Sequence, residues 1–167
     1  MKIIGLSGQS KVGRQFVADY LAFRGFVVIE SRAPIYEFLD AFHKFGFCER
    51  LAEKLLRETD PPFFCDVLNH IISEHSSCTD LIVIPDVTHE TEAEWIRQRG
   101  VLWHISWNDD RDLFSPHENE PIVSDHGTPD QIHEVIDDLI LLSLGIDMRK
   151  SVSHRVLRNS GKELVAS

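Results

Sequence analysis

Residues 2–15, KIIGLSGQSKVGRQ, decide how the rest of the chain is interpreted. The run 2–7 is short and apolar and ends at a glycine, which is typical of a buried strand. Residues 14–24 carry large side chains at helical spacing: Phe16, Val17, Tyr20 and Leu21. In a strand, glycine loop and helix arranged in this order, backbone N–H groups can surround a phosphate at the start of the helix.

Strand-like and helix-like segments alternate along the remaining sequence. Further strands are expected at 26–30, 80–85, 101–107 and 121–124, and helices at 33–45, 48–57, 62–74, 91–99 and 129–142. Thr128, Pro129 and Gln131 form a capping signal for the last helix. Strands that are apolar on both faces belong to parallel sheets, so we expect an α/β fold with a mainly parallel central sheet covered by helices on both faces.

The segment Gly8–Gln15 has the glycine spacing of the phosphate-binding motif G-x-x-x-x-G-K-[ST]. Arg14 replaces the lysine that reaches the phosphates, and Gln15 replaces the hydroxyl that holds Mg²⁺. Arginine keeps the charge with a different shape and reach, and glutamine is a poor Mg²⁺ ligand. Because the glycine spacing and the backbone N–H groups remain, we still expect phosphate binding by this segment: Gly8, Gln9, Ser10, Lys11, Val12, Gly13, Arg14 and Gln15. A simple turn without a ligand is the alternative.

A second candidate residue, Asp86, directly follows the expected strand 80–85. Parallel α/β sheets bind their ligands at the carboxyl ends of the strands. A carboxylate at this position can orient Mg²⁺ or a substrate hydroxyl. The alternative is that Asp86 only caps a turn.

Three segments together resemble phage deoxynucleoside monophosphate kinases, a P-loop kinase family: IIGLSGQSKVGRQFVADYL, LIVIPDVTHETEAEWIRQRGVLWHISW and HENEPIVSDHGTPDQIHEVI. The resemblance implies a P-loop NTPase or nucleotide-kinase fold, and ATP-dependent transfer of a phosphoryl group to a deoxynucleoside monophosphate, with Mg²⁺. It implies catalytic roles for Arg14 and Asp86. The chain departs from the family pattern at Arg14, at Gln15 and Phe16, and at Thr88, where the family usually has an arginine.

The same resemblance implies that two arginines bind the substrate. Arg32 follows the second expected strand, where the nucleobase site of this family begins. Arg111 lies in a loop that resembles the lid, together with the His-x-x-Glu pair His117 and Glu120. The alternative for both arginines is a solvated surface position.

Length and charge limit the class of protein. We expect one P-loop kinase-like domain at 1–142 and a basic C-terminal tail or docked extension at 143–167. The net charge is −10, and it is −13 without the +3 tail, which disfavours binding to duplex nucleic acid.

No apolar run is long enough to span a membrane, and the start of the chain lacks a signal peptide, so we expect a cytoplasmic protein. No metal site is expected from the three cysteines and the scattered histidines.

Two functions fit these features. One is a nucleotide kinase that uses ATP and Mg²⁺. The other is a catalytically inactive protein of the same fold that binds or regulates a partner protein. The altered motif favours the second function, whereas Asp86 and the ordered set of motifs favour the first.

Overall fold

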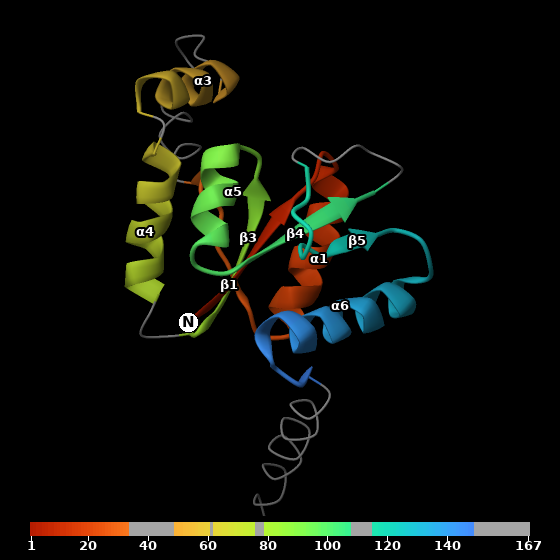
Figure 1. Cartoon of the computed structure of the whole chain (residues 1–167). Helices are drawn as coiled ribbons and strands as arrows, with labels where there is room; N and C mark the ends of the chain where they lie inside the picture. Colours follow the sequence, from red (N-terminus) through yellow and green to blue (C-terminus); the bar gives the residue numbers. More distant parts are fainter. Residues whose placement is uncertain (34–48, 61, 76–78, 108–114, 149–167) are drawn as a thin grey trace, which may run out of the picture. The chain divides into compact units, whose positions relative to one another are not determined.

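The computed structural model describes residues 1–33, 49–60, 62–75, 79–107 and 115–148 (Figure 1). The chain divides into two compact units, residues 1–125 and 126–167. The expected helix at 33–45 lies almost entirely outside the described residues, and Arg111 lies outside them altogether.

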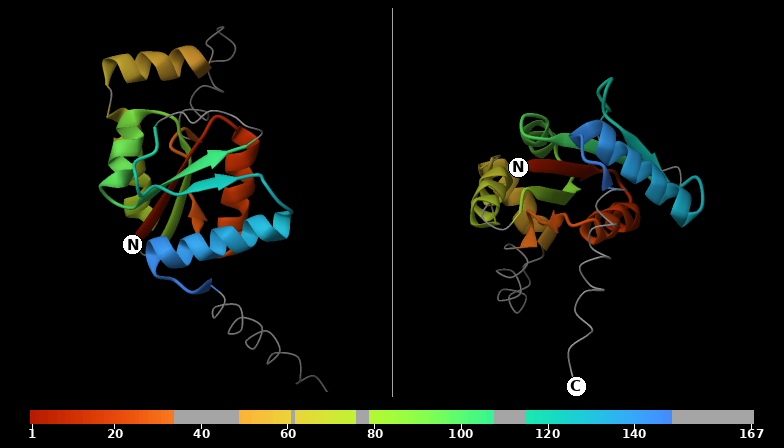
Figure 2. Two further views of the ribbon diagram at one scale, coloured as in Figure 1. Left: turned by 45° about the vertical axis from the view of Figure 1, so that its right-hand side comes forward. Right: turned by 90° about the horizontal axis from the view of Figure 1, so that it is seen from below.

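Unit 1 contains a sheet of five parallel strands in the order β2-β3-β1-β4-β5. The strands are β1 (Lys2–Ser7), β2 (Val27–Val28), β3 (Leu81–Val87), β4 (Val101–Ser106) and β5 (Ile122–Ser124). Its helices are α1 (Lys11–Phe23), α3 (Glu49–Thr59), α4 (Phe63–His75) and α5 (Glu90–Arg97). Helix α1 covers one face of the sheet and α5 the other (Figure 2). The expected α/β fold with a parallel sheet is confirmed.

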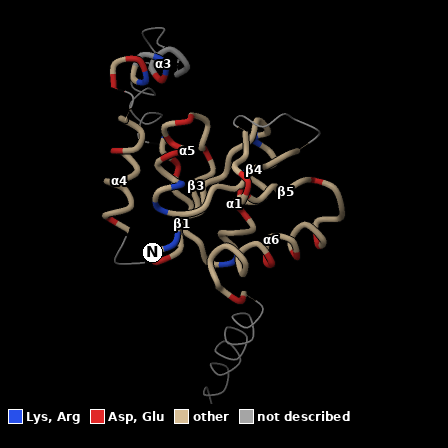
Figure 3. The backbone as a smooth tube through the Cα atoms, viewed as in Figure 1, with Lys and Arg blue, Asp and Glu red and all other residues tan. Residues whose placement is uncertain are grey.

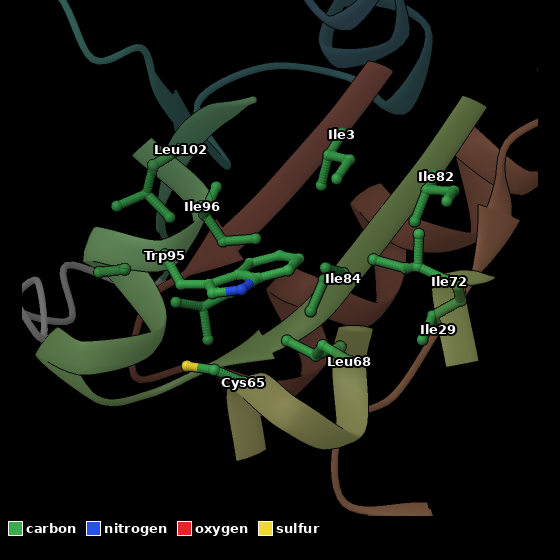
Figure 4. Packing of buried hydrophobic residues seen from close by; sticks show 12 residues of the cluster. Ile3, Ile29, Cys65, Leu68, Ile72, Ile82, Ile84, Trp95, Ile96 and Leu102 are labelled. Carbon is green, nitrogen blue, oxygen red and sulfur yellow. The ribbon is translucent and has the colours of Figure 1, made fainter. Parts of the chain in front are cut away.

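The central strands are buried on both faces because their side chains alternate between two helix layers. On one face, buried side chains of the sheet pack against those of α4 and α5 (Figure 4). The sheet contributes Ile3, Ile82, Ile84 and Leu102, and the two helices contribute Leu68, Ile72, Trp95 and Ile96. On the other face lie the buried residues Ile4 and Leu6 of β1, and α1 buries Val17 and Leu21. Burying each large apolar side chain contributes about 1.5–3 kcal/mol, and this explains the unbroken apolar runs of the sequence.

The bounds of β3, α1 and β2 differ from the expectation. Asp86 lies within β3 rather than just after it, because β3 stays paired with β1 across a bulge as far as the Ser7–Val87 pair. Helix α1 begins at Lys11 because Ser10 caps it: Ser10 Oγ accepts a hydrogen bond from Gly13 N at 3.1 Å. The strand expected at 26–30 is reduced to Val27–Val28.

Unit 2 is described as far as residue 148 and contains α6 (Pro129–Leu144). The predicted capping box is confirmed: Thr128 Oγ1 accepts from Gln131 N, and Gln131 Oε1 accepts from Thr128 N at 2.9 Å. Gly145 ends the helix in the left-handed conformation. Acidic residues recur along α5 and α6 (Figure 3). Residues 149–167 lie outside the described part, so the basic tail at 143–167 stays a prediction. None of the described helices is long and apolar enough to cross a membrane.

Candidate functional site

A cavity of about 220 Å³ lies in unit 1, beside the start of α1 and the carboxyl ends of the strands. Its lining residues come from α1, α3, β3 and the segments after β2 and β3: Lys11, Arg14, Gln15, Glu30, Arg32, Glu53, Pro85, Asp86 and Thr88. Five of the residues predicted from the sequence therefore meet in one place: Lys11, Arg14, Gln15, Arg32 and Asp86. The other predicted phosphate-binding residues, Gly8, Gln9, Ser10, Val12 and Gly13, are not part of its lining.

The connection between β1 and α1 is shorter than the motif predicts. Only residues 8–10 separate the strand from the helix, and residues 11–13 form the first helical turn. Arg14 N donates to Ser10 O at 3.1 Å, as in a regular helix. The helix start nevertheless places the positive end of its dipole at this edge of the sheet.

Packing within the protein accounts for both glycines of the motif. Gly8 has φ +143°, and a Cβ atom there would lie 2.3 Å from Ile105 O. A Cβ atom on Gly13 would lie 2.8 Å from the side chain of Trp107. The two glycines are thus required by the fold itself, whether or not a ligand binds.

Arg14 places a partly buried positive charge in the cavity lining without an ion-pair partner. Its guanidinium donates a hydrogen bond to Gly8 O, and its Nε is buried without a partner. It forms no ion pair with any carboxylate in the described part of the chain. Burial lowers the pKa of Arg14, and the charge of Arg32 lowers it further, whereas the charge of Asp86 raises it without reversing the shift. A partly buried charge that has no ion pair of its own is stabilised by an anion, so this position favours an anion.

Asp86 uses one carboxylate oxygen within the protein. Its Oδ2 accepts from Ser31 Oγ at 2.8 Å and from Arg32 N at 3.2 Å, and it forms an ion pair with Arg32 Nη1 at 3.0 Å. Its Oδ1 is buried and has no hydrogen-bond partner among the described residues. The side chain is therefore fixed by one oxygen, and the other has unused capacity to accept hydrogen bonds.

Arg32, predicted to bind substrate, is held within an ion-pair network. Its side chain is 7% exposed; Nε contacts Glu53 Oε1 at 3.0 Å, and Nη2 lies 3.5 Å from Glu92 Oε1. Burial would lower the pKa of Arg32, but the charges of Glu92, Asp86 and Glu53 outweigh it and raise the pKa. Arg32 lines the cavity, yet its donors are engaged by the protein, and a role in substrate binding stays a prediction.

Sequence reasoning did not identify the rest of this network. Arg57 Nη2 contacts Glu92 Oε1 at 2.8 Å and Glu53 Oε1 at 3.0 Å, and its guanidinium lies 4.1 Å from the centre of the Phe64 ring. Burial would raise the pKa of Glu53, but the charge of Arg32 and the hydrogen bonds from Arg57 and Arg32 outweigh it and lower the pKa. The i,i+4 spacing of Glu53 and Arg57 was the available signal.

The His-x-x-Glu pair of the lid-like loop lies in a separate cluster. Glu120 accepts from Arg97 Nε at 2.7 Å, from His117 N at 2.8 Å and from the buried His104 Nε2 at 2.8 Å. Burial would raise the pKa of Glu120, but the hydrogen bonds from Arg97, His117 and His104 outweigh it and lower the pKa to about 2. The loop before β5 is thus fastened to α5 and β4.

A Mg²⁺ ion would find few protein ligands in this cavity. The described residues contain no group of three or more His, Cys, Asp or Glu side chains that could hold a metal ion. Gln15 Nε2 donates to Asp19 Oδ1 at 2.7 Å, so the side chain in the place of the metal-binding hydroxyl is engaged on the exposed face of α1. Asp86 Oδ1 fits as a single carboxylate ligand, with phosphate and water supplying the others, which is a common arrangement for Mg²⁺.

The five parallel strands in the order 2-3-1-4-5, with helices on both faces, form an α/β fold that is also found in a solved kinase structure. No family model and no curated protein sequence matches this chain. An unliganded sugar kinase from Janibacter sp. HTCC2649 is similar in structure, with a TM-score of 0.55 and 14% identity over 89% of this chain and 97% of that chain. A shikimate kinase from Acinetobacter baumannii, in complex with shikimate, is less similar, with a TM-score of 0.35 and 15% identity over 99% of this chain and 96% of that chain. At such identities the likeness concerns the fold alone.

Proposed function

We propose that this chain is a protein of P-loop kinase-like fold that binds a small phosphorylated molecule, such as a nucleotide, and serves as a binding or regulatory protein. The observation that carries the proposal is the guanidinium of Arg14, which lines the cavity, has a buried Nε without a hydrogen-bond partner and forms no ion pair with a carboxylate among the described residues. A phosphate bound there would add a negative charge beside it. Lys11 lines the same cavity at the first position of α1, where the helix dipole also favours an anion.

Three features favour binding over rapid phosphoryl transfer. The guanidinium of Arg14 already donates to Gly8 O. The Gln15 side chain bonds to Asp19 and offers no hydroxyl to a metal. Asp86 Oδ2 is engaged by Ser31 and Arg32. Phosphoryl transfer depends on cations and a metal held at the transferred group, so a site that lacks these parts binds phosphate better than it transfers it.

The test is calorimetric titration of the full chain with ATP, deoxynucleoside monophosphates and inorganic phosphate, each with and without Mg²⁺. We expect at least one phosphorylated compound to bind. Arg14→Ala should weaken binding at least about tenfold, because it removes a charge-assisted hydrogen bond, and Arg14→Lys should weaken it less. Lys54→Ala removes one exposed positive charge outside the cavity and should leave the affinity unchanged. If no phosphorylated compound binds, the proposal is wrong.

A second candidate function is transfer of a phosphoryl group from ATP to a small acceptor such as a deoxynucleoside monophosphate. The observation that favours it is Asp86 Oδ1, which has no partner and fits as a Mg²⁺ ligand. When bound, the metal would neutralise phosphate charge. Formation of nucleoside diphosphate that is lost in Asp86→Asn would support this function. Absence of turnover in a protein that binds ATP would exclude it.

A further inference from the structure

The cavity lining changes in charge along the edge of the sheet. The helix that follows β1 contributes the positive residues Lys11 and Arg14. The neighbouring strand β3 contributes Asp86, and the segment after β2, the edge strand, contributes Glu30. Glu53 joins them from α3. A ligand in this cavity therefore meets cations near β1 and carboxylates near β3 and β2.

The positive charges of the arginines in the network do not fully neutralise the carboxylates of this acidic half of the cavity. Arg32 and Arg57 share three carboxylates, those of Glu53, Asp86 and Glu92, so the network keeps one excess negative charge. The donors of Arg32 are directed to acceptors of the protein, including the Asp86 and Thr88 oxygens. This half of the cavity consequently offers mainly hydrogen-bond acceptors to a ligand.

Two carboxylates of this half, the exposed Glu30 and Asp86, still have acceptor oxygens that the described residues do not use. Glu30 forms no ion pair with any cation in the parts of the chain that the structure describes. Asp86 Oδ1 is buried and has no hydrogen-bond partner in the same residues. Unsatisfied acceptors near a cavity favour ligand groups that donate, and they repel a second phosphate.

On the basis of the proposed function, we infer that the ligand is a compact phosphate ester that carries hydroxyl or ammonium groups away from the phosphate, as a phosphorylated polyol or amino-polyol does. The phosphate lies toward Arg14 and Lys11, and the donor groups lie toward Asp86, Glu53 and Glu30. The volume of about 220 Å³ agrees with a compact molecule, since pockets for larger organic ligands measure roughly 300–1,000 Å³.

The experiment compares four probes by calorimetric titration of the full chain: inorganic phosphate, butyl phosphate, glucose 6-phosphate and glucosamine 6-phosphate. Butyl phosphate is an ester without donor groups in its chain. At least one of the two sugar phosphates should bind about tenfold or more tightly than butyl phosphate, as expected for a hydrogen bond to a charged acceptor. Comparing the affinities for glucose 6-phosphate and glucosamine 6-phosphate separates the contribution of a hydroxyl group to binding from that of an ammonium group.

The acidic half is tested with Glu30→Gln and Glu53→Gln, which keep the size of the side chain and remove its charge. Both substitutions should reduce the ratio of the affinity for the sugar phosphates to the affinity for butyl phosphate. Glu58→Gln, on the exposed surface of α3 and outside the cavity, should keep the difference. Thermal unfolding of each variant verifies folding, and Glu30→Gln keeps the test valid if the network variant unfolds, because Glu30 is exposed.

The outcomes separate this inference from the proposed function. If butyl phosphate binds as tightly as both sugar phosphates, or if the preference survives Glu30→Gln and Glu53→Gln together, the inference is wrong and phosphate binding stands. If none of the four probes and no nucleotide binds, the proposed function fails, and the inference fails with it.

Discussion

Two arginines in the same cavity lining differ in how their charges are compensated. Arg32 contacts three carboxylates, whose combined effect raises its pKa against the cost of burial. Arg14 contacts none among the described residues, and burial lowers its pKa. The first pattern is that of a structural residue, whose charge is paired with carboxylates from other segments of the fold. The second is that of a partly buried cation without an ion pair of its own, although the nearby charge of Asp86 acts on it, and such a cation is stabilised further by a bound anion.

Gly8 is a residue at which packing and backbone conformation act together. Gly8→Ala would place a Cβ atom 2.3 Å from Ile105 O in a conformation with φ +143°, which side chains rarely adopt. We expect the free energy of unfolding to fall by about 2 kcal/mol or more, because the strain adds to a clash with a backbone atom. Urea unfolding followed by circular dichroism measures the change.

The matched control for this prediction is Gly145→Ala. Gly145 also has a positive φ, +68°, but no atom lies within 4 Å of the Cβ position. Its cost should be only the conformational one, about 1 kcal/mol. Equal losses in the two variants would show that the contact with Ile105 does not limit position 8.

At the scale of elements, helices α1 and α6 begin where a side chain accepts a hydrogen bond from the first turn. Thr128 caps α6, and Thr128→Ala should lower the free energy of unfolding by about 1 kcal/mol, because an amide of the first turn loses its partner. Thr128→Ser keeps the hydroxyl and should retain most of the stability. Chemical denaturation of both variants tests the prediction, and an equal loss in the two would contradict it.

The sequence predicted some elements well and others poorly for identifiable reasons. Strand β1 was predicted with its observed ends and β4 to within one residue, because apolar runs between glycines and polar segments mark buried strands. The start of α1 was predicted at residue 14 instead of 11, because the glycine spacing indicated a loop as far as Gly13, whereas Ser10 caps the helix. The arginine network could not be predicted, because Arg32, Glu53 and Glu92 come from distant segments and no local pattern states which pair together.

Across unit 1 as a whole, the Arg32 network joins α3, β3 and α5. Among the described residues, Arg32→Ala would leave Glu53 and Glu92 with Arg57 as their ion-pair partner and would remove the ion pair of Asp86. We expect a loss of about 3–5 kcal/mol in the free energy of unfolding, the usual cost of removing one member of a buried ionic network. Lys54→Ala, which breaks only an exposed pair with Glu58, should change the stability by less than about 1 kcal/mol. A thermal midpoint that Arg32→Ala leaves unchanged would contradict the structural role of the network.

The acid stability of the molecule should depend on Glu120. Its pKa is about 2 in the folded chain against an ordinary value of 4.5, so the folded state binds this proton less readily than the unfolded state does. The stabilisation is therefore fully present above the unfolded pKa of about 4.5 and is lost as the pH falls toward 2. Glu120→Gln should show a weaker fall in unfolding free energy between pH 6 and pH 3 in urea titrations. Glu118→Gln, an exposed neighbour, serves as the control and should keep the steep fall of the unmodified chain. Identical pH profiles for Glu120→Gln and the unmodified chain would mean that the contacts with Arg97, His104 and His117 do not stabilise the folded state.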